Sequence, residues 1–406
     1  MRSLWGTLRV WSNTEMEIKM QKKSILFVID NMNIGGIQKN MLNLLIALQD
    51  RFDLTLCVFN AAGSYMKWIP ASVRIIEPKH AFHYLGISNA EAKKHPLTFL
   101  CRTFYYAVMR CFGNKAMYQL MIKLQKPLGT YDFAVSGMQA AVSGVFYSGA
   151  NEFVLDCVHA AQKIAYIHCD FVQSGIDNPY NRTVYRRLDK ILVPNRSNYE
   201  QLLAVMPELR GKVFIVNNFC NYDEVREKAD TDTVVYDASG INIVTVARIS
   251  PEKGVDRAIK VMQRLKAEGF RFTYHVVGGG GDYAQLCAEV EQNGLQDTVF
   301  LHGYDSNPYR YLKHADLFLL PSRNEAAGLV IDEARSLGVP VLSTKTVAAE
   351  ETLAQHQCGW VCENTDAGIY DGLKRLLQAP EIIREKAADL RGMPCNNDLP
   401  TAQFCA

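Results

Sequence analysis

Two glutamates in one stretch of this chain have the types and spacing that ligand binding requires. The stretch reads PSRNEAAGLVIDEARSLGVPVLST over residues 321–344, with one short apolar run before it and another at its end. Apolar residues at helical spacing predict a helix over 329–337 between two buried strands. Glu325 then lies just before the helix, and Glu333 lies about two turns further along, at ~1.5 Å per residue.

The start of this predicted helix offers an anion site between the two carboxylates. Free backbone N–H groups would point outward at Ala327, Gly328 and Leu329. A phosphate held there has one carboxylate on each side, which suits a ligand with hydroxyls at both ends. A nucleotide-sugar has that order of groups: sugar, diphosphate, ribose. The alternative is an ordinary strand–helix–strand unit with two solvated acids.

Two cations lie in the loop after another predicted strand, 241–246. Arg248 and Lys253 precede a helix that runs through Leu265. Fixed cations beside a helix N-terminus hold a diphosphate and stabilise the charge that develops as it leaves. The alternative is a solvated basic loop.

A histidine and three glycines follow other predicted strands. His168 lies at the C-terminal end of a strand, which is the edge where open α/β sheets bind ligands. Gly36 lies between the first strand and the first helix, and Gly278 and Gly280 follow a strand in the second half. Glycine lets the backbone turn sharply or approach a ligand. The second glycine turn lacks the G-x-G-x-x-G spacing of a dinucleotide site.

Strand and helix patterns alternate along the chain, which predicts an α/β fold with doubly wound parallel sheets. A length of 406 residues indicates two domains. We divide the chain into a disordered extension, an N-terminal domain, a charged linker, a C-terminal domain and a tail, with the bounds 1–19, 20–222, 223–240, 241–390 and 391–406. Met20 is an alternative initiator to Met1.

Composition argues against several classes of protein. A net charge of +2 gives no global attraction to nucleic acid, and no nucleic-acid-binding module is recognised. The eleven cysteines include no C-x-x-C pair, which is typical of reduced thiols in the cytoplasm. No apolar run is long enough to span a membrane. We find no Asp-x-Asp sequence placed to bridge Mg²⁺ to a diphosphate, and expect no metal cofactor.

Residues 93–126 have the most unusual composition of the N-terminal half. They carry seven Lys and Arg and no Asp or Glu, with six interleaved aromatic residues. A basic, aromatic, amphipathic segment is typical of docking onto an anionic membrane surface. The alternative places the aromatic residues in the core and the cations on a solvated face.

The stretch over 321–344 resembles a family signature. Written as PS-x-x-E-x-x-G-L-x-x-x-E-A-x-x-x-G-x-P-V, it is similar to that of retaining glycosyltransferase family four, the glycosyl transferases group 1. This family has the GT-B fold, in which two Rossmann-like domains face each other across a cleft. The resemblance covers residues 24–380, with several motifs in the expected order. It departs at Ala326, where the family has glycine, and the added methyl group would tighten the donor-sugar pocket.

The resemblance implies roles for the candidate residues. Glu325 would lie by the donor sugar and Glu333 would bind the ribose hydroxyls. Arg248 and Lys253 would stabilise the leaving diphosphate, and His168 would approach the donor sugar and the acceptor. The remaining donor-site positions are Gly36, Gly278, Gly280, Ala327, Gly328 and Leu329.

The implied reaction is transfer of a hexose from a UDP- or GDP-linked sugar, with retention, to a hydroxyl of a saccharide or lipid-linked acceptor. The implied pathway makes bacterial cell-surface polysaccharide, such as capsule or lipopolysaccharide. We expect a cytoplasmic protein that contacts the inner face of the plasma membrane through 93–126. Two alternatives share the fold: a nucleotide-sugar epimerase and a catalytically silent binding protein. Product analysis separates all three.

Overall fold

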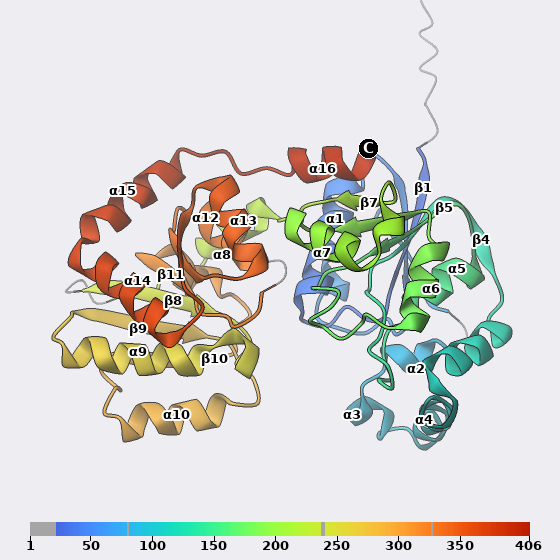
Figure 1. The fold of residues 1–406 in the computed structure, drawn as a ribbon, viewed down its shortest axis with the longest axis horizontal. Coiled ribbons are helices and arrows are strands. Elements are labelled where there is room, and N and C mark those ends of the chain that lie inside the picture. Colours follow the sequence, from blue (N-terminus) through green and yellow to red (C-terminus); the bar gives the residue numbers. More distant parts are fainter. Residues whose placement is uncertain (1–21, 79–80, 237–239, 326–327) are drawn as a thin grey trace, which may run out of the picture.

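The computed structural model describes residues 22–78, 81–236, 240–325 and 328–406. Within these ranges the chain forms two domains side by side, each built on one parallel sheet with packed helices (Figure 1). This arrangement confirms the predicted α/β fold class. The predicted extension over 1–19, the alternative initiator Met20, and Ala326 and Ala327 lie outside the described residues.

The first domain has a seven-stranded parallel sheet with the strand order β3-β2-β1-β4-β5-β6-β7. At its centre, Phe27 of β1 pairs with Leu56 of β2 and with Val135 of β4. The run from Ile25 to Ile29 is fully buried, as expected for a strand with both faces covered. The strands are β1 Ser24–Ile29, β2 Asp53–Val58, β3 Arg74–Ile76, β4 Leu128–Ser136, β5 Val158–Tyr166, β6 Lys190–Val193 and β7 Val213–Ile215.

The helices of the first domain connect these strands. Two of them begin at an asparagine whose side chain accepts a backbone N–H, Asn178 for α6 and Asn195 for α7. The long helix α4 has a kink at Gly113, where φ is 83°. The helices are α1 Gly36–Leu48, α2 His83–Gly86, α3 Asn89–Ala92, α4 Pro96–Leu124, α5 Ala150–Cys157, α6 Pro179–Arg187 and α7 Arg196–Val205.

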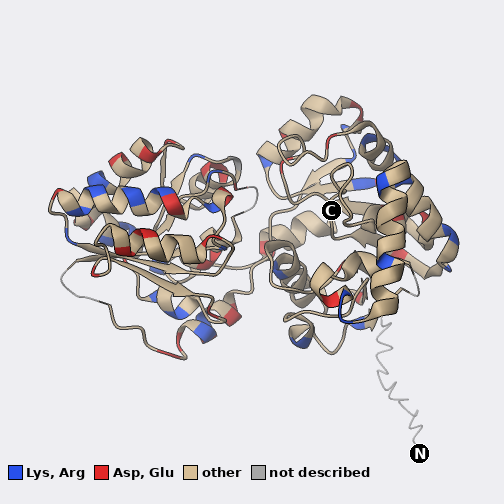
Figure 2. Ribbon diagram, turned by 90° about the horizontal axis from the view of Figure 1, so that it is seen from below, with Lys and Arg blue, Asp and Glu red and all other residues tan. Residues whose placement is uncertain are grey.

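The second domain has a six-stranded parallel sheet with the order β10-β9-β8-β11-β12-β13. Its strands are β8 Ile241–Val246, β9 Phe272–Val277, β10 Val299–Gly303, β11 Leu317–Leu320, β12 Val341–Thr344 and β13 Gly359–Cys362. Its helices are α9 Val255–Ala267, α10 Tyr283–Gln292, α11 Tyr309–Lys313, α12 Leu329–Ser336, α13 Val347–His356, α14 Asp366–Gln378 and α15 Pro380–Arg391. Acidic and basic residues are interspersed over its helices (Figure 2), in keeping with a net charge of +2.

The charged segment between the domains contains a helix, α8 Tyr222–Ala229, which lies largely within the linker predicted over 223–240. Val225 and Ala229 bury their side chains against Tyr309 of α11, and α8 also packs on α12. The helix is therefore attached to the second domain, although it directly follows the last strand of the first.

The C-terminal segment returns to the first domain (Figure 1) and ends in helix α16, Asp398–Cys405. The side chain of Asn397 accepts the backbone N–H of Cys220 at 3.0 Å and donates to its carbonyl at 2.7 Å. Phe404 lies 6.2 Å from the Phe27 ring and 6.4 Å from the Phe52 ring, centre to centre. The tail thus adds an aromatic side chain to the core of the first domain.

Replacing Phe404 with alanine tests this attachment. Because the ring is only partly buried, Phe404→Ala should cost about 2 kcal/mol, which corresponds to a fall of about 4–8 °C in the thermal midpoint. Differential scanning calorimetry measures the change, and Leu399→Ala, at an exposed position of the same helix, is the control. Equal midpoints for the two variants would show that the ring contributes nothing specific.

Candidate functional site

A lysine and a glutamate meet at the carboxyl ends of two neighbouring strands of the second sheet. The Lys253 Nζ atom lies 2.6 Å from Oε2 of Glu325. Lys253 ends a short 3₁₀ helix, Pro251–Lys253, after β8, and Glu325 lies in the loop after β11. Because β8 and β11 are adjacent, their loops reach the same edge of the sheet. The sheet therefore joins two predicted site residues that are 72 positions apart.

A buried arginine on α9 holds the loop that carries Glu325. The Arg257 guanidinium donates to the carbonyl of Pro321 at 2.6 and 2.9 Å and to that of Ser322 at 2.8 Å. It also donates to the Asn364 side chain at 2.7 Å. Burial lowers the pKa of Arg257, yet four hydrogen bonds to acceptors compensate for much of the loss of water. The chain on the N-terminal side of Glu325 is thus fixed to the helix that follows Lys253.

The second predicted cation has a different partner. Arg248 Nη2 lies 2.6 Å from Oε1 of Glu252, and 71% of the arginine side chain is exposed. Arg248 and Lys253 therefore share one loop, as predicted, but each is paired with its own carboxylate. Most of the Arg248 side chain is exposed to solvent, on the same loop as Lys253.

The glycine turn after β9 packs directly on the loop that carries these cations. A Cβ atom on Gly278 would lie 1.8 Å from the Ala247 carbonyl oxygen, and one on Gly280 would lie 1.8 Å from that of Ile249. The Ile249 N–H donates to the Gly279 carbonyl at 2.8 Å. In this structure the two glycines allow one loop to approach the other, which sets the position of the Arg248 loop.

The helix predicted after Glu325 is present as α12, with Leu329 as its first residue. Gly328 lies at its N-cap with φ of 35°, a left-handed conformation that favours glycine. Glu333, one turn along α12, accepts a hydrogen bond from the Tyr309 hydroxyl at 3.0 Å. Burial raises the pKa of Glu333 to about 7, against the opposing effects of Lys39 and Tyr309.

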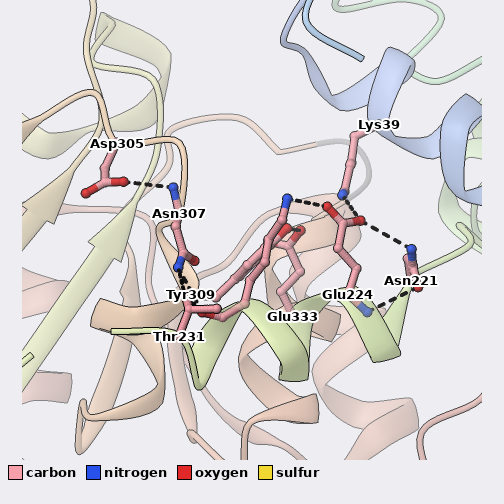
Figure 3. A network of polar contacts seen from close by, with 9 residues as sticks. Lys39, Asn221, Glu224, Thr231, Asp305, Asn307, Tyr309 and Glu333 are labelled. Carbon is pink, nitrogen blue, oxygen red and sulfur yellow. Dashed lines mark hydrogen bonds and ion pairs between the residues drawn. The ribbon is translucent and has the colours of Figure 1, made fainter. Parts of the chain in front are cut away.

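Two charged residues that the sequence analysis did not single out lie in the same network (Figure 3). Lys39 of α1 forms an ion pair of 2.7 Å with Glu224 of α8. Lys39 is only 7% exposed. No local sequence pattern marks this ion pair, because the partner of Lys39 lies 185 residues away.

His168 lies just after β5, at the carboxyl edge of the first sheet. Its Nε2 atom is 3.2 Å from the Gly137 carbonyl oxygen, and its ring stacks on Tyr166 with centres 4.3 Å apart. Burial lowers the pKa of His168 to about 4. The ring is therefore uncharged at neutral pH, Nε2–H donates to the carbonyl, and Nδ1 is the acceptor atom.

The glycine pair after β1 begins helix α1, with Gly35 at the N-cap and Gly36 as the first helical residue. A Cβ atom added to Gly36 would meet no atom within 4 Å. Packing therefore does not require glycine at position 36. The open space beside Gly36, at the N-terminus of α1, is compatible with the predicted position of Gly36 facing a ligand.

The described part of the chain contains no group of three or more His, Cys, Asp or Glu arranged to hold a metal ion. Asp230 and Asp232 do form an Asp-x-Asp sequence, but both carboxylates have cationic partners. Asp230 pairs with Lys313, and Asp232 pairs with Arg310 at 3.3 Å. Among the described helices, none is long and apolar enough to cross a membrane.

The second domain matches a known protein family. The model of the family described as glycosyl transferases group 1 matches residues 233–391. The second domain is a glycosyl transferases group 1 domain. The matched residues include the loop that carries Lys253, the loop that carries Glu325 and the helix that carries Glu333. It confirms the family resemblance predicted from the signature over 321–344.

Curated relatives of this chain include bacterial glycosyltransferases. The amylovoran biosynthesis glycosyltransferase AmsK of Erwinia amylovora is 34% identical over 135 residues, which is 31% of this chain and 33% of the relative. The chain thus aligns with about a third of the length of the first relatives it matches. A Campylobacter jejuni N-acetylgalactosamine-N,N'-diacetylbacillosaminyl-diphospho-undecaprenol 4-alpha-N-acetylgalactosaminyltransferase is 23% identical over 383 residues, covering 88% of this chain and 91% of that protein.

Solved structures show that the group 1 domain and its N-terminal neighbour together form the GT-B fold. The structure of TarM matches with a TM-score of 0.67 at 14% identity, over 95% of this chain and 98% of TarM. WaaG, a glycosyltransferase involved in lipopolysaccharide biosynthesis, matches with a TM-score of 0.58 at 16% identity, over 93% of this chain and 98% of WaaG. The predicted fold is confirmed over nearly the whole chain.

The anchor of the Glu325 loop can be tested by substituting Arg257. Arg257→Lys keeps the charge but loses the planar set of donors to Pro321 and Ser322, at a cost of about 2–3 kcal/mol. We expect a lower thermal midpoint and faster amide hydrogen exchange over residues 322–325. Arg264→Lys, on the exposed side of the same helix, is the control. Unchanged exchange over 322–325 would contradict the anchoring role.

Proposed function

We propose that this protein is a retaining glycosyltransferase that moves a hexose from a nucleoside-diphosphate sugar to a hydroxyl group. The observation that carries the proposal is the contact between Lys253 and Glu325 beside the start of α12, with Arg248 on the same loop. A cation and a carboxylate at one sheet edge suit the two parts of such a donor. The diphosphate needs positive charge, and the sugar hydroxyls need a hydrogen-bond acceptor.

In this proposal the second domain binds the donor without a metal ion. Lys253 and Arg248 supply the charge that stabilises the leaving diphosphate. Glu325, which is paired with Lys253, accepts hydrogen bonds from the sugar hydroxyls and orients the anomeric carbon. Glu333 accepts hydrogen bonds from the two ribose hydroxyls. Neutral N–H groups at Gly328 and Leu329 face the phosphates at the positive end of α12.

The acceptor hydroxyl would enter from the first domain and attack the face from which the diphosphate departs. His168 is neutral because burial lowers its pKa to about 4. Its Nδ1 atom accepts a hydrogen bond from a sugar or acceptor hydroxyl, while the Gly137 carbonyl fixes the ring. A neutral imidazole orients a hydroxyl without adding positive charge near the forming oxocarbenium-like centre.

We place the reaction in the synthesis of bacterial cell-surface polysaccharide. The support comes from relatives whose names include amylovoran and colanic acid biosynthesis and an undecaprenol-diphosphate acceptor. We infer a saccharide or lipid-linked acceptor and a UDP- or GDP-linked donor. All eleven cysteines are free, which fits a reducing cytoplasm.

A surface of the first domain fits contact with the inner face of the plasma membrane. Leu97, Leu100 and Phe104 of α4 are 73%, 66% and 55% exposed, and their spacing places them along one side of the helix. Seven cations occur over 93–126, without any acid. Apolar side chains flanked by cations favour an anionic lipid surface, where a lipid-linked acceptor is also found. Docking there would bring the first domain to its acceptor.

The donor site is tested by binding and product analysis with a panel of UDP- and GDP-sugars. A bound sugar nucleotide at ~100 times its dissociation constant stabilises the fold by ~2.7 kcal/mol. We expect one to stabilise the wild type. Lys253→Met should lower kcat/KM by about 10²–10³-fold, while Lys260→Met, an exposed lysine of α9, keeps it. A chelator should leave the rate unchanged.

The product identifies the reaction class. A glycosylated acceptor whose anomeric configuration matches that of the donor, determined by NMR, supports the proposal. An inverted product would contradict retention. An epimerised nucleotide-sugar, or binding without turnover, would instead support one of the two alternatives that share the fold.

Membrane contact is tested by co-sedimentation with vesicles of phosphatidylglycerol or phosphatidylcholine. The wild type should bind the anionic vesicles, and the triple variant Leu97→Gln/Leu100→Gln/Phe104→Gln should bind at least about tenfold more weakly. Leu399→Gln, an exposed apolar residue on α16, should bind as the wild type does. Equal binding by the triple variant and wild type would show that α4 is not the docking surface.

A further inference from the structure

A buried lysine from the first domain reaches the ribose end of the proposed donor site. Lys39 lies in the first turn of α1, three residues after Gly36. Its Nζ atom is 2.7 Å from Oε2 of Glu224, and only 9% of its side chain is exposed (Figure 3). Lys39 also lies near the ring of Tyr65, with Nζ 5.8 Å from the ring centre. A lysine is rarely so buried without a charged partner.

The carboxylate that receives Lys39 is held on the second domain. The Asn221 amide donates to Oε2 of Glu224 at 3.3 Å, and Lys228 Nζ lies 2.6 Å from Oε1. Burial alone would raise the pKa of Glu224, but Lys39 and Lys228 outweigh it and the pKa is lowered. Because α8 packs on α11 and α12, the Lys39–Glu224 pair joins the two domains.

The same lysine acts on Glu333, one turn along α12. Burial raises the pKa of Glu333, and the positive charge of Lys39 is the strongest influence in the opposite direction. The Glu224 carboxylate raises that pKa further. Two acids from the second domain thus share one cation that the first domain supplies. The titratable and charged groups that face Glu333 are Lys39 of α1, Tyr65, Cys220, Glu224 of α8, Tyr309 of α11, and Asp332 of its own helix.

A ribose diol donates two hydrogen bonds, and only an ionised carboxylate accepts both without giving up an acceptor site. We propose that Lys39 is a positioning residue for the donor. Its positive charge favours the ionised form of Glu333, which accepts hydrogen bonds from the ribose hydroxyls, and this charge is supplied only when the two domains are together. The inference rests on the proposed glycosyltransferase function. It adds a residue of the first domain to a site otherwise built from the second.

The arrangement couples donor binding to the relative position of the domains. If the domains separate, Lys39 leaves both Glu224 and Glu333, so Glu224 keeps only Lys228 as a cationic partner and Glu333 loses the cation that lowers its pKa. Repulsion then favours protonation of Glu333 and weakens its contact with ribose. Donor binding in turn favours the closed arrangement, because the two equilibria share one free energy of coupling.

The test measures the dissociation constant of the nucleotide-sugar that stabilises the wild type, by calorimetry between about pH 5 and about pH 9. The diphosphate of a nucleotide-sugar is doubly esterified and has no group that titrates in this range. Binding by the wild type should tighten as the pH rises through about 7, the pKa of Glu333. Glu333→Gln should remove this dependence.

Two charge variants should move the midpoint of this pH dependence, the pH at which donor binding is half-way between its weak and tight limits, in opposite directions. Lys39→Met removes the cation and should raise it by about one pH unit, while Glu224→Gln removes the competing acid and should lower it. Lys39→Arg should keep the wild-type midpoint. Lys374→Met, which breaks an exposed 2.8 Å pair with Glu268, is the control and should leave the midpoint unchanged. A purely structural role would weaken binding in both variants without opposite shifts.

Loss of folding can be separated from loss of function. Lys39→Met leaves the partly buried Glu224 with Lys228 as its only lysine partner, which is costly, so the double variant Lys39→Met/Glu224→Gln removes both charges. Its midpoint should lie between those of the wild type and Lys39→Met. A wild-type midpoint in the double variant and in Glu224→Gln would overturn the role of Lys39. If no nucleotide-sugar binds the wild type at any pH, the proposed function fails and this inference fails with it.

Discussion

The candidate site depends on one buried guanidinium. Arg257 cannot be buried at low cost unless its donors are satisfied, and the acceptors available to it are the carbonyls at the end of β11 and the Asn364 side chain. That requirement fixes the start of the loop that leads to Glu325. The left-handed Gly254 at the start of α9 permits the approach, because a Cβ atom there would lie 2.1 Å from the Pro321 carbonyl oxygen. The contact between Lys253 and Glu325 follows from this packing.

Among the described residues, the contacts between the two domains include polar pairs and aromatic side chains. The Glu351 carboxylate of α13 accepts the backbone N–H groups of Arg196 and Ser197, at 2.8 and 3.2 Å, at the positive end of α7. Lys39 and Glu224 pair on the side of the proposed donor site. The tail adds Phe404 to the first domain's core. Polar contacts of this kind exchange with water at modest cost, so they permit relative domain motion.

Burial shifts the pKa values of two residues of the candidate site in opposite directions. It lowers the pKa of His168, so the imidazole is neutral, and it raises the pKa of Glu333 to about 7, so the carboxyl is poised to titrate near neutrality. The physical cause is the same, because removal from water disfavours the charged form of either group. The difference in outcome makes Glu333 sensitive to nearby charges such as Lys39, while His168 stays uncharged.

The sequence by itself determined the fold class, most of the strands and the residues of the paired motifs. Continuous apolar runs such as Ile25–Ile29 are fully buried in a parallel sheet, and the periods of strand and helix are local properties of the chain. It also placed the predicted helix after Glu325. Only the tertiary structure decided which charges meet. Lys253 pairs with Glu325 across 72 positions and Lys39 with Glu224 across 185, because such partners are set by how sheets and domains pack and no local pattern encodes them.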